Sequence, residues 1–356
     1  MAENPGEIKY TEMSAEEFVN HWKGFVNESE GYNPYTFRNI EVKEQIYISS
    51  EENLQNIALA KCKINSIWVN KCFSGYISIQ ENTIVDNLRV DKESRIDGIQ
   101  IYDSEIKHFY ITGAIIGNLI ISNTKLHNNL FIEGESILKN TFYVKNKSFL
   151  PGIYIKEGVI TADIDISDSM VNYLNIEKSK ILALRVIDNS ICGKIRVRDS
   201  STDNIRVLDS MTDDISLFNL IVKNLVIIQN ATVPSLEIGD CENAHEISIT
   251  NTNISSFNLI NRKSINVKFS FTKFENIDLE GSVIPKDTSI QFNDCQVNHL
   301  IYSSTQNHGN IYFQNLSPLK KFQSRVKGPA FGNNSYKRDD ENKYIFQDKT
   351  EQARIL

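Results

Sequence analysis

The 356-residue chain has little of what marks most functional classes of protein. It contains only 7 prolines and 16 glycines, too few for long disordered linkers. No apolar stretch approaches the ~18 residues of a membrane span. The first residues, Met1 to Asn4, are polar and acidic, so they lack the basic and apolar regions of a secretory signal. We therefore expect a soluble, cytoplasmic chain without a membrane segment.

Residues with catalytic or metal-binding potential are also sparse. The formal net charge of −7 argues against nucleic acid as a partner, because such proteins usually present a basic face. The six histidines are scattered without an HExxH spacing, and the five cysteines contain no CxxC pair. The sequence thus predicts no metal site and no cofactor.

Apolar-x-apolar triplets recur every ten or eleven residues along most of the chain. Internal repeats of this kind decide the fold. The clearest triplets begin at Ile57, Ile67, Ile77, Leu88, Ile99, Phe109, Leu119, Leu130, Ile153, Ile164, Leu174, Leu184, Ile195, Ile205, Ile215, Leu225, Leu236, Ile247 and Phe257.

Within a unit such as Ile99 to His108, positions 1 and 3 are large and apolar, position 5 is often Asp or Asn, and position 6 is often small. Period-two alternation indicates a strand with one buried face. Asp, Asn and Ser at the break suit a corner. The pattern predicts an all-β fold, a single parallel β-solenoid with about 20–22 residues per coil. Ile99, Leu119, Ile164, Leu184, Ile205 and Leu225 should line one internal side.

The ten-residue unit divides into two five-residue sides, and this resembles the pentapeptide-repeat family. The sides from Ser104, Ala114 and Thr124 place a small residue two positions before a large one, as that family does. The alternate sides place a large residue in the small position. The resemblance spans roughly residues 50–316 and implies a right-handed coil with about four sides.

The two ends differ from the repeat, so we divide the chain into an N-terminal segment (1–49), the solenoid (50–316) and an irregular tail (317–356). Ser14 and Glu17 form a capping box, followed by Phe18, Trp22 and Phe25 on one helical face. We expect residues 14–26 to form a helix that caps the first coil; a partner-binding helix is the alternative. The tail resembles the approach to a further domain in some bacterial proteins.

The repeat slips at two places, where we expect irregular loops. One lies at Lys139–Gly152 and the other at Gly281–Asp287.

Four of the cysteines, Cys62, Cys72, Cys241 and Cys295, fall in the small position of their units. A free cysteine behaves there as a small apolar residue. The Asp and Asn corner positions predict backbone capping, with imitation of DNA phosphates as the alternative. Outward columns such as Asp165, Arg185 and Arg206 contain no pair of carboxylates with a base, so we do not expect an enzyme.

The candidate protein-binding patch combines two predicted outward columns. Position 4 of alternate units holds Ile187, Leu208 and Ile228, and position 2 of the same units holds Arg185, Arg206 and Val226. Exposed apolar groups beside arginine are typical of interaction sites. The alternatives are that the C-terminal tail covers this patch or that crowding at the corner half-buries it.

These observations favour a non-enzymatic scaffold that binds another protein or a second copy of itself, as a sensor or regulatory part of a larger bacterial assembly. A DNA-mimicking protein and a carbohydrate-active β-helix are the two alternatives. The first would need a continuous acidic face, and the second a groove with acidic and basic groups.

Overall fold

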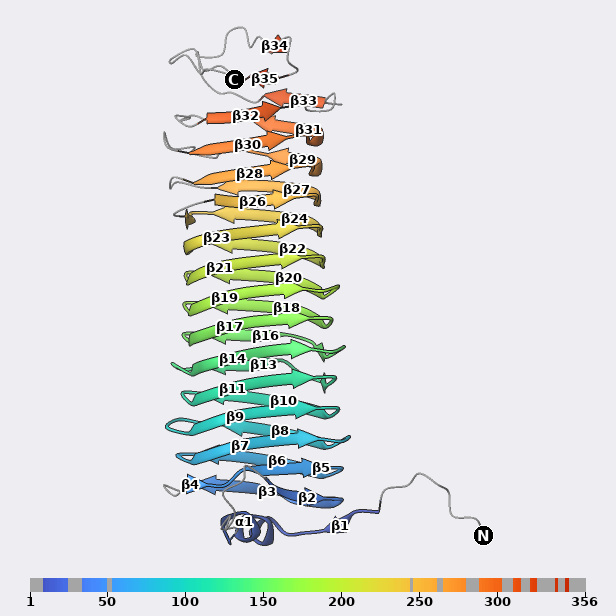
Figure 1. Cartoon of the computed structure of the whole chain (residues 1–356), viewed down its shortest axis with the longest axis vertical. Helices are drawn as coiled ribbons and strands as arrows, with labels where there is room; N and C mark the ends of the chain where they lie inside the picture. The colour runs from blue at the N-terminus through green and yellow to red at the C-terminus, as the bar shows by residue number, and fades with distance from the viewer. Residues whose placement is uncertain are drawn as a thin grey trace, which may run out of the picture. The chain divides into compact units, whose positions relative to one another are not determined.

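The computed structural model describes residues 9–24, 34–49, 53–243, 246–260, 265–279, 288–302, 310–314, 321–324, 337–338 and 343–345. The protein is an all-β parallel solenoid with one short helix near the N-terminus (Figure 1), as the repeat predicts. By its internal contacts the chain divides into two units. Unit 1 contains Met1–Tyr173 and Ser179–Ile181; unit 2 contains Leu174–Lys178 and Leu182–Leu356.

Unit 1 contains two parallel sheets, one on each side of the coil. Sheet 1A contains β1 (Thr11–Glu12), β3 (Ile40–Ser49), β6 (Lys63–Asn70), β8 (Ile84–Val90), β10 (Glu105–Thr112), β12 (Lys125–Leu126), β13 (Leu130–Glu133), β15 (Phe149–Leu150) and β16 (Ile153–Lys156). Sheet 1B contains β2 (Tyr35–Arg38), β4 (Asn53–Leu54), β5 (Ile57–Ala60), β7 (Phe73–Gln80), β9 (Arg95–Tyr102), β11 (Ile115–Ser122), β14 (Ile137–Lys145) and β17 (Val159–Ser167). The stack already includes β3, which precedes the expected start at residue 50.

Two strands, β18 (Met170–Glu177) and β19 (Lys180–Ile187), each have residues in both units. In unit 2, sheet 2A contains β20 (Ile191–Arg198), β22 (Met211–Phe218), β24 (Thr232–Gly239), β27 (Asn253–Ile260), β29 (Lys273–Asp278), β31 (Gln296–Tyr302) and β33 (Lys321–Ser324). Sheet 2B contains β21 (Ser201–Leu208), β23 (Ile221–Gln229), β25 (Glu242–Asn243), β26 (Glu246–Thr250), β28 (Asn266–Ser270), β30 (Ser289–Asn293), β32 (Asn310–Gln314), β34 (Lys337–Arg338) and β35 (Lys343–Ile345).

Stacked apolar side chains fill the inside of the coils. Phe109 pairs with Leu130 in the following coil, 21 residues later, within the expected 20–22. Ile99, Leu119, Ile164, Leu184 and Ile205 are buried as expected. Leu225 is not: it pairs with the outward Asn204, while the buried Val226 pairs with Ile205. The shift arises because β23 has two residues between Val222 and Leu225, where β21 has one residue between Thr202 and Asn204.

Each coil turns at residues in the left-handed backbone region. Asp103, Asn123, Asp209, Asn230 and Asn251 all have φ between 47° and 51°. Asn and Asp tolerate this conformation better than other non-glycine residues. Their side chains also form ladders: Asn230 Nδ2 donates to Asp209 Oδ1, and Asn251 Nδ2 donates to Asn230 Oδ1, both at 2.9 Å. At the corners these residues therefore provide left-handed turns and ladders of side-chain hydrogen bonds between coils.

The small residue after each corner points inward and ties neighbouring coils together. Thr124 Oγ1 donates to the carbonyl oxygens of Ser122, at 2.9 Å, and of Ile101 in the preceding coil, at 3.3 Å. Cys241 Sγ makes the equivalent contacts with Gly239 and Leu217, both at 3.4 Å. All five cysteines are buried and free, and burial raises the pKa of the Cys72 thiol to about 11. The prediction that four of them fill the small inward position is confirmed.

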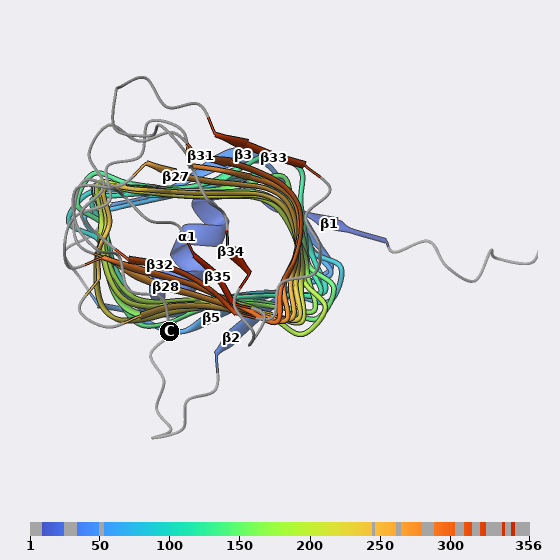
Figure 2. The same cartoon turned by 90° about the horizontal axis from the view of Figure 1, so that it is seen from above.

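The expected N-terminal cap is present as α1 (Ala15–Gly24). Ser14 Oγ accepts from the Glu17 amide at 3.1 Å, and Glu17 Oε2 accepts from the Ser14 amide at 2.9 Å. Phe18 and Trp22 are buried, and Phe18 stacks on Phe37 of β2 at 4.2 Å. Seen along the coils, α1 lies within the outline of the turns (Figure 2). Phe25 lies outside the described residues.

The prediction of an irregular loop at Lys139–Gly152 is wrong. This segment is built into the coils: β14 pairs with β11, and the short β15 pairs with β12. The spacing slips because of a one-residue bulge between Leu138 and Thr141, which a strand can absorb without leaving its sheet. The second expected loop, Gly281–Asp287, lies outside the described residues.

Candidate protein-binding surface

The expected patch does not form as a single surface. Val226 and Ile228 are buried in the core, which contradicts their expected exposure, because the extra residue in β23 reverses the inward and outward positions. Ile227, rather than Val226, lies beside Arg206 on the outer face. Arg185, Ile187, Arg206 and Leu208 are half-buried on the outside.

The exposed aliphatic side chains of unit 2 lie elsewhere. Ile191 and Met211 pair at the first position of β20 and β22, and Met211 is 57 % exposed. On the side of β24 the apolar run ends, because the residue that pairs with Met211 is Thr232.

Unit 1 has a longer feature, an outward column of aromatic side chains on sheet 1A. Parallel register pairs Tyr47 with Trp68, Trp68 with Arg89, Arg89 with Tyr110, Tyr110 with Phe131 and Phe131 with Tyr154. We call the residues Tyr47, Trp68, Arg89, Tyr110, Phe131, Tyr154 and the adjoining Tyr173 the aromatic column. One member stands on each coil from β3 to β16.

In the second half of the aromatic column, from Tyr110 to Tyr173, the rings form a continuous stack. The centroid distances are 5.4 Å for Tyr110–Phe131, 5.2 Å for Phe131–Tyr154 and 5.3 Å for Tyr154–Tyr173. The ring planes differ by 6°, 22° and 22°. Since each ring covers the face of the next, the stack presents mainly ring edges to solvent.

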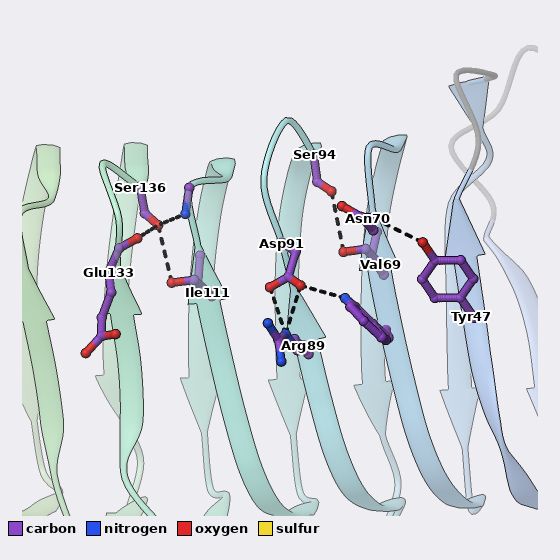
Figure 3. Close-up of polar contacts among 11 residues, drawn as sticks. Tyr47, Val69, Asn70, Arg89, Asp91, Ser94, Ile111, Glu133 and Ser136 are labelled. Carbon is purple, nitrogen blue, oxygen red and sulfur yellow. Dashed lines mark hydrogen bonds and ion pairs between the residues drawn. The ribbon is translucent and has the colours of Figure 1, made fainter.

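In the first half of the aromatic column, the buried carboxylate of Asp91 accepts hydrogen bonds from two members, Trp68 and Arg89. Asp91 Oδ2 accepts from Trp68 Nε1 at 2.7 Å and from Arg89 Nε at 2.9 Å, and Asp91 Oδ1 accepts from Arg89 Nε at 2.8 Å. The Arg89 guanidinium lies over the Trp68 ring, 5.0 Å from its centroid. Figure 3 shows Asp91 at the turn beyond β8, with both oxygens directed at Arg89.

Tyr47 closes this end of the column and is 46 % exposed. Its ring meets Trp68 edge-on at 5.1 Å. Its hydroxyl accepts from Asn70 Nδ2 at 3.1 Å, and this bond lowers the pKa of the Tyr47 hydroxyl (Figure 3). The polar ends of Tyr47, Trp68 and Arg89 are thus fixed by neighbours, which limits the number of conformations they adopt.

The solenoid itself does not require aromatic residues in this column. Trp68, Arg89 and Tyr110 are the sixth residues of their strands. The sixth residues of the paired strands β20, β22, β24, β27 and β29 in unit 2 are Arg196, Ser216, Glu237, Asn258 and Asp278. The same backbone position is therefore polar over five coils of one unit and aromatic over most of the other.

A cavity of about 450 Å³ opens beside the starts of β3, β6, β8 and β10. Glu41, Lys43, Lys63, Asp86 and Lys107 contribute its charged lining. Asp86 is ion-paired with Lys107 at 2.8 Å, and Lys63 lies over the Tyr10 ring. Asp86 is thus paired with a cation, and Lys63 contacts an aromatic ring.

Nowhere in the described ranges do three or more His, Cys, Asp or Glu side chains gather closely enough to hold a metal ion. Within the same part of the chain, no helix combines the length and the apolar character that crossing a bilayer requires.

The sequence contains a signal for the aromatic column that the repeat pattern alone does not reveal. Tyr47, Trp68, Arg89, Tyr110 and Phe131 are each 21 residues apart. Comparing outward positions one whole coil apart, over the N-terminal half, would have aligned them. Comparison with family models, with curated proteins and with solved structures finds no match to this chain.

Proposed function

We propose that the chain is a non-enzymatic scaffold that binds a protein partner through the aromatic column of unit 1. The observation that carries the proposal is the contrast between the units: the column is aromatic where the same fold accepts polar residues elsewhere. A feature that the fold does not need, and that places apolar rings at the surface, calls for a role outside the fold.

The composition of the column favours a protein partner. Tyr, Trp, Phe and Arg are enriched at the centres of protein interfaces, where Lys, Glu and Asp are depleted. The outward residues on one flank are the uncharged Gln45, Ser66 and Asn87, followed by His108. This neutral flank resembles the margin of an interface centre rather than a solvated charged face.

The ring geometry argues against the two alternatives. Sugar rings and nucleobases bind by stacking on exposed aromatic faces, and here the neighbouring rings occupy those faces. A DNA mimic needs a continuous acidic face, whereas the aromatic column has arginine as its charged member. The outward column of sheet 2A also mixes Arg196 with Glu237 and Asp278.

The resemblance to pentapeptide-repeat proteins is consistent with this proposal. The inward Ser104 and Ile106 keep that family's small-then-large order, whereas Phe109 and Ile111 replace it with two large residues. We extend the proposal to a cytoplasmic scaffold that serves as a sensor or regulatory part of a larger bacterial assembly.

The test is a double variant, Tyr110→Ser with Phe131→Ser, in which serine copies the residue that β22 carries in the same position. Partners captured from a lysate of the native host by the unaltered chain would be purified and their binding remeasured by calorimetry. We expect the double variant to weaken binding at least tenfold while its circular dichroism spectrum and melting temperature stay close to those of the unaltered chain.

Arg196→Ser, at the equivalent position of unit 2, is the matched control and should leave the affinity unchanged. Sedimentation of the chain alone measures self-association through the same residues. If the double variant binds and self-associates like the unaltered chain, the column is not the binding surface and the proposal is wrong.

A further inference from the structure

The contacts that hold the Arg89 side chain in place engage only one of its three guanidinium nitrogens. Asp91 accepts from Nε alone, and the terminal nitrogens Nη1 and Nη2 have no acceptor among the described residues. The side chain is 50 % exposed. Its guanidinium lies over the Trp68 ring, and the two terminal nitrogens have N–H donors available to solvent.

We propose that Trp68, Arg89 and Asp91 form a receptor for one carboxylate of the protein partner. This inference rests on the proposed function, since the same column supplies the surrounding contacts. The Trp68 ring supports the guanidinium of Arg89, which lies over it. Arg89 donates two hydrogen bonds to the partner's carboxylate. Asp91 is a positioning residue that does not touch the partner.

The donor geometry favours a carboxylate over other acceptors. A guanidinium presents paired N–H groups that match the two oxygens of a carboxylate, whereas a lone carbonyl fills only one of them. Asp91 already balances the charge of Arg89, so recognition depends on this geometry more than on net positive charge. A phosphate dianion would meet the opposing charge of Asp91 without a second cation to offset it.

The column beyond Arg89 indicates what should stand next to the carboxylate. Aromatic ring edges carry partial positive charge and accept the faces of other rings in edge-to-face contacts. Tyr110 and Phe131 present such edges on the two following coils. The partner is therefore a protein segment in which Asp or Glu lies beside aromatic or large aliphatic side chains.

Asp91 can serve as a positioning residue because it is itself held in place. It is 8 % exposed. Its amide donates to the Val69 carbonyl oxygen at 2.8 Å, and its own carbonyl accepts from the Ser94 amide at 3.2 Å. A carboxylate fixed in this way sets the plane of the guanidinium before the partner arrives, which lowers the ordering cost of binding.

The test uses a displayed library of random peptides, selected on the immobilised full chain after depletion on the Trp68→Ala chain. Peptides that survive would be synthesised in pairs, with each acidic residue present either as the acid or as its amide, and binding measured by fluorescence polarisation. We expect the survivors to share one Asp or Glu beside apolar residues, and the amide form to bind ten- to a hundredfold more weakly.

The receptor residue is then identified by a double-mutant cycle. On the Arg89→Gln chain the acid and amide peptides should bind equally, and Arg89→Lys should restore only a small part of the difference because lysine lacks the planar fork. Asp91→Asn should weaken the acid peptide more than the amide peptide, an effect that general destabilisation would not produce.

Two results would overturn the inference. Acid and amide peptides that bind the unaltered chain equally would remove the carboxylate receptor; if those peptides still require Tyr110 and Phe131, the proposed function stands without it. A selection that yields nothing after depletion would also contradict the receptor; the proposed binding surface is then judged separately, by the Tyr110→Ser and Phe131→Ser double variant.

Discussion

The α-carbon of Gly117 in β11 lies against the backbone of Asp97 in the preceding coil: a β-carbon at position 117 would be 2.1 Å from the Asp97 carbonyl oxygen. Real β-carbons do not approach other atoms so closely, and backbone cannot rotate away as a side chain can. Coil stacking therefore depends on glycine at this position.

Replacing Gly117 with alanine should destabilise unit 1 by about 1–3 kcal/mol, the usual cost of overpacking, measured by urea unfolding. Gly134→Asn is the matched control. Gly134 has φ of 64° and more space, with Thr112 Cγ2 3.3 Å from the position of a β-carbon, and other corners already use Asn. Equal stability of the two variants would contradict the predicted clash.

Phe271 occupies a corner in an unfavourable way. Its φ is 52° and its side chain is 62 % exposed, so a bulky residue sits in the left-handed region without burying its ring. Phe271→Asn should raise the free energy of unfolding by about 1 kcal/mol, because the left-handed conformation costs asparagine less. Calorimetric melting would show the gain, and a lower melting temperature would mean that the ring makes a contact that offsets the strain.

The buried thiols should make stability fall at high pH. Burial raises the pKa of Cys72 to about 11 and that of Cys295 to about 11, above the ~8.5 of a free thiol. The folded state then keeps protons that the unfolded state releases, so their contribution is fully present below about pH 8.5 and lost as the pH rises toward 11. Urea midpoints at increasing pH would measure the fall.

Cys72→Ser separates this effect from general alkaline denaturation. Serine fills the same inward position at Ser104 and Ser200, so the variant should fold normally at pH 7. It should lose less stability than the unaltered chain between pH 8.5 and 11. Identical pH profiles would show that Cys72 does not contribute to the decline.

The helix α1 should protect the first coil. Trp22 is buried, and its Nε1 donates to the Gln55 carbonyl oxygen at 2.9 Å. Trp22→Ala should cost about 3–5 kcal/mol, as for other buried aromatics, and should release the helix from the coil. Hydrogen exchange should then increase in β2, β3 and β5 before it increases in β9 and β11.

Trp22→Phe keeps most of the apolar contact and removes only the hydrogen bond, so its effect should be much smaller. The exposed strand edges of the alanine variant should also favour association between molecules, which light scattering would detect. Uniform exchange throughout unit 1 in the alanine variant would contradict a local capping role.

The fold was predictable because the apolar alternation and the corner residues repeat with the same period. The wrong assignment of buried and exposed residues occurred where the alternation alone permits two registers. Leu225 to Ile228 are four consecutive apolar residues, so alternation alone permits either register. The corner resolves it: the last inward residue stands two positions before the left-handed residue, as Val207 does before Asp209. Counting back from Asn230 selects Ile228 and Val226 as the buried pair.

The candidate surface was harder to predict because it depends on contacts between coils. Exposure of an outward residue is set by its neighbours about 21 positions away, not by those beside it in sequence. The link between Trp68 and Asp91 spans 23 residues and two different positions of the repeat, so no single column contains it. Only the folded coils bring that carboxylate to the aromatic column.

The same outward position is polar in some coils and aromatic in others, and this affects how substitutions can alter the surface of the solenoid. Each coil contributes one side chain to the column at a pitch of ~4.8 Å, and the inward residues and corners that build the coil are separate positions. Substitutions in the column can therefore rewrite recognition one coil at a time while the framework stays constant. A single inserted residue acts differently, since it exchanges the two faces of a strand, as in β23, and turns a surface residue into a core residue.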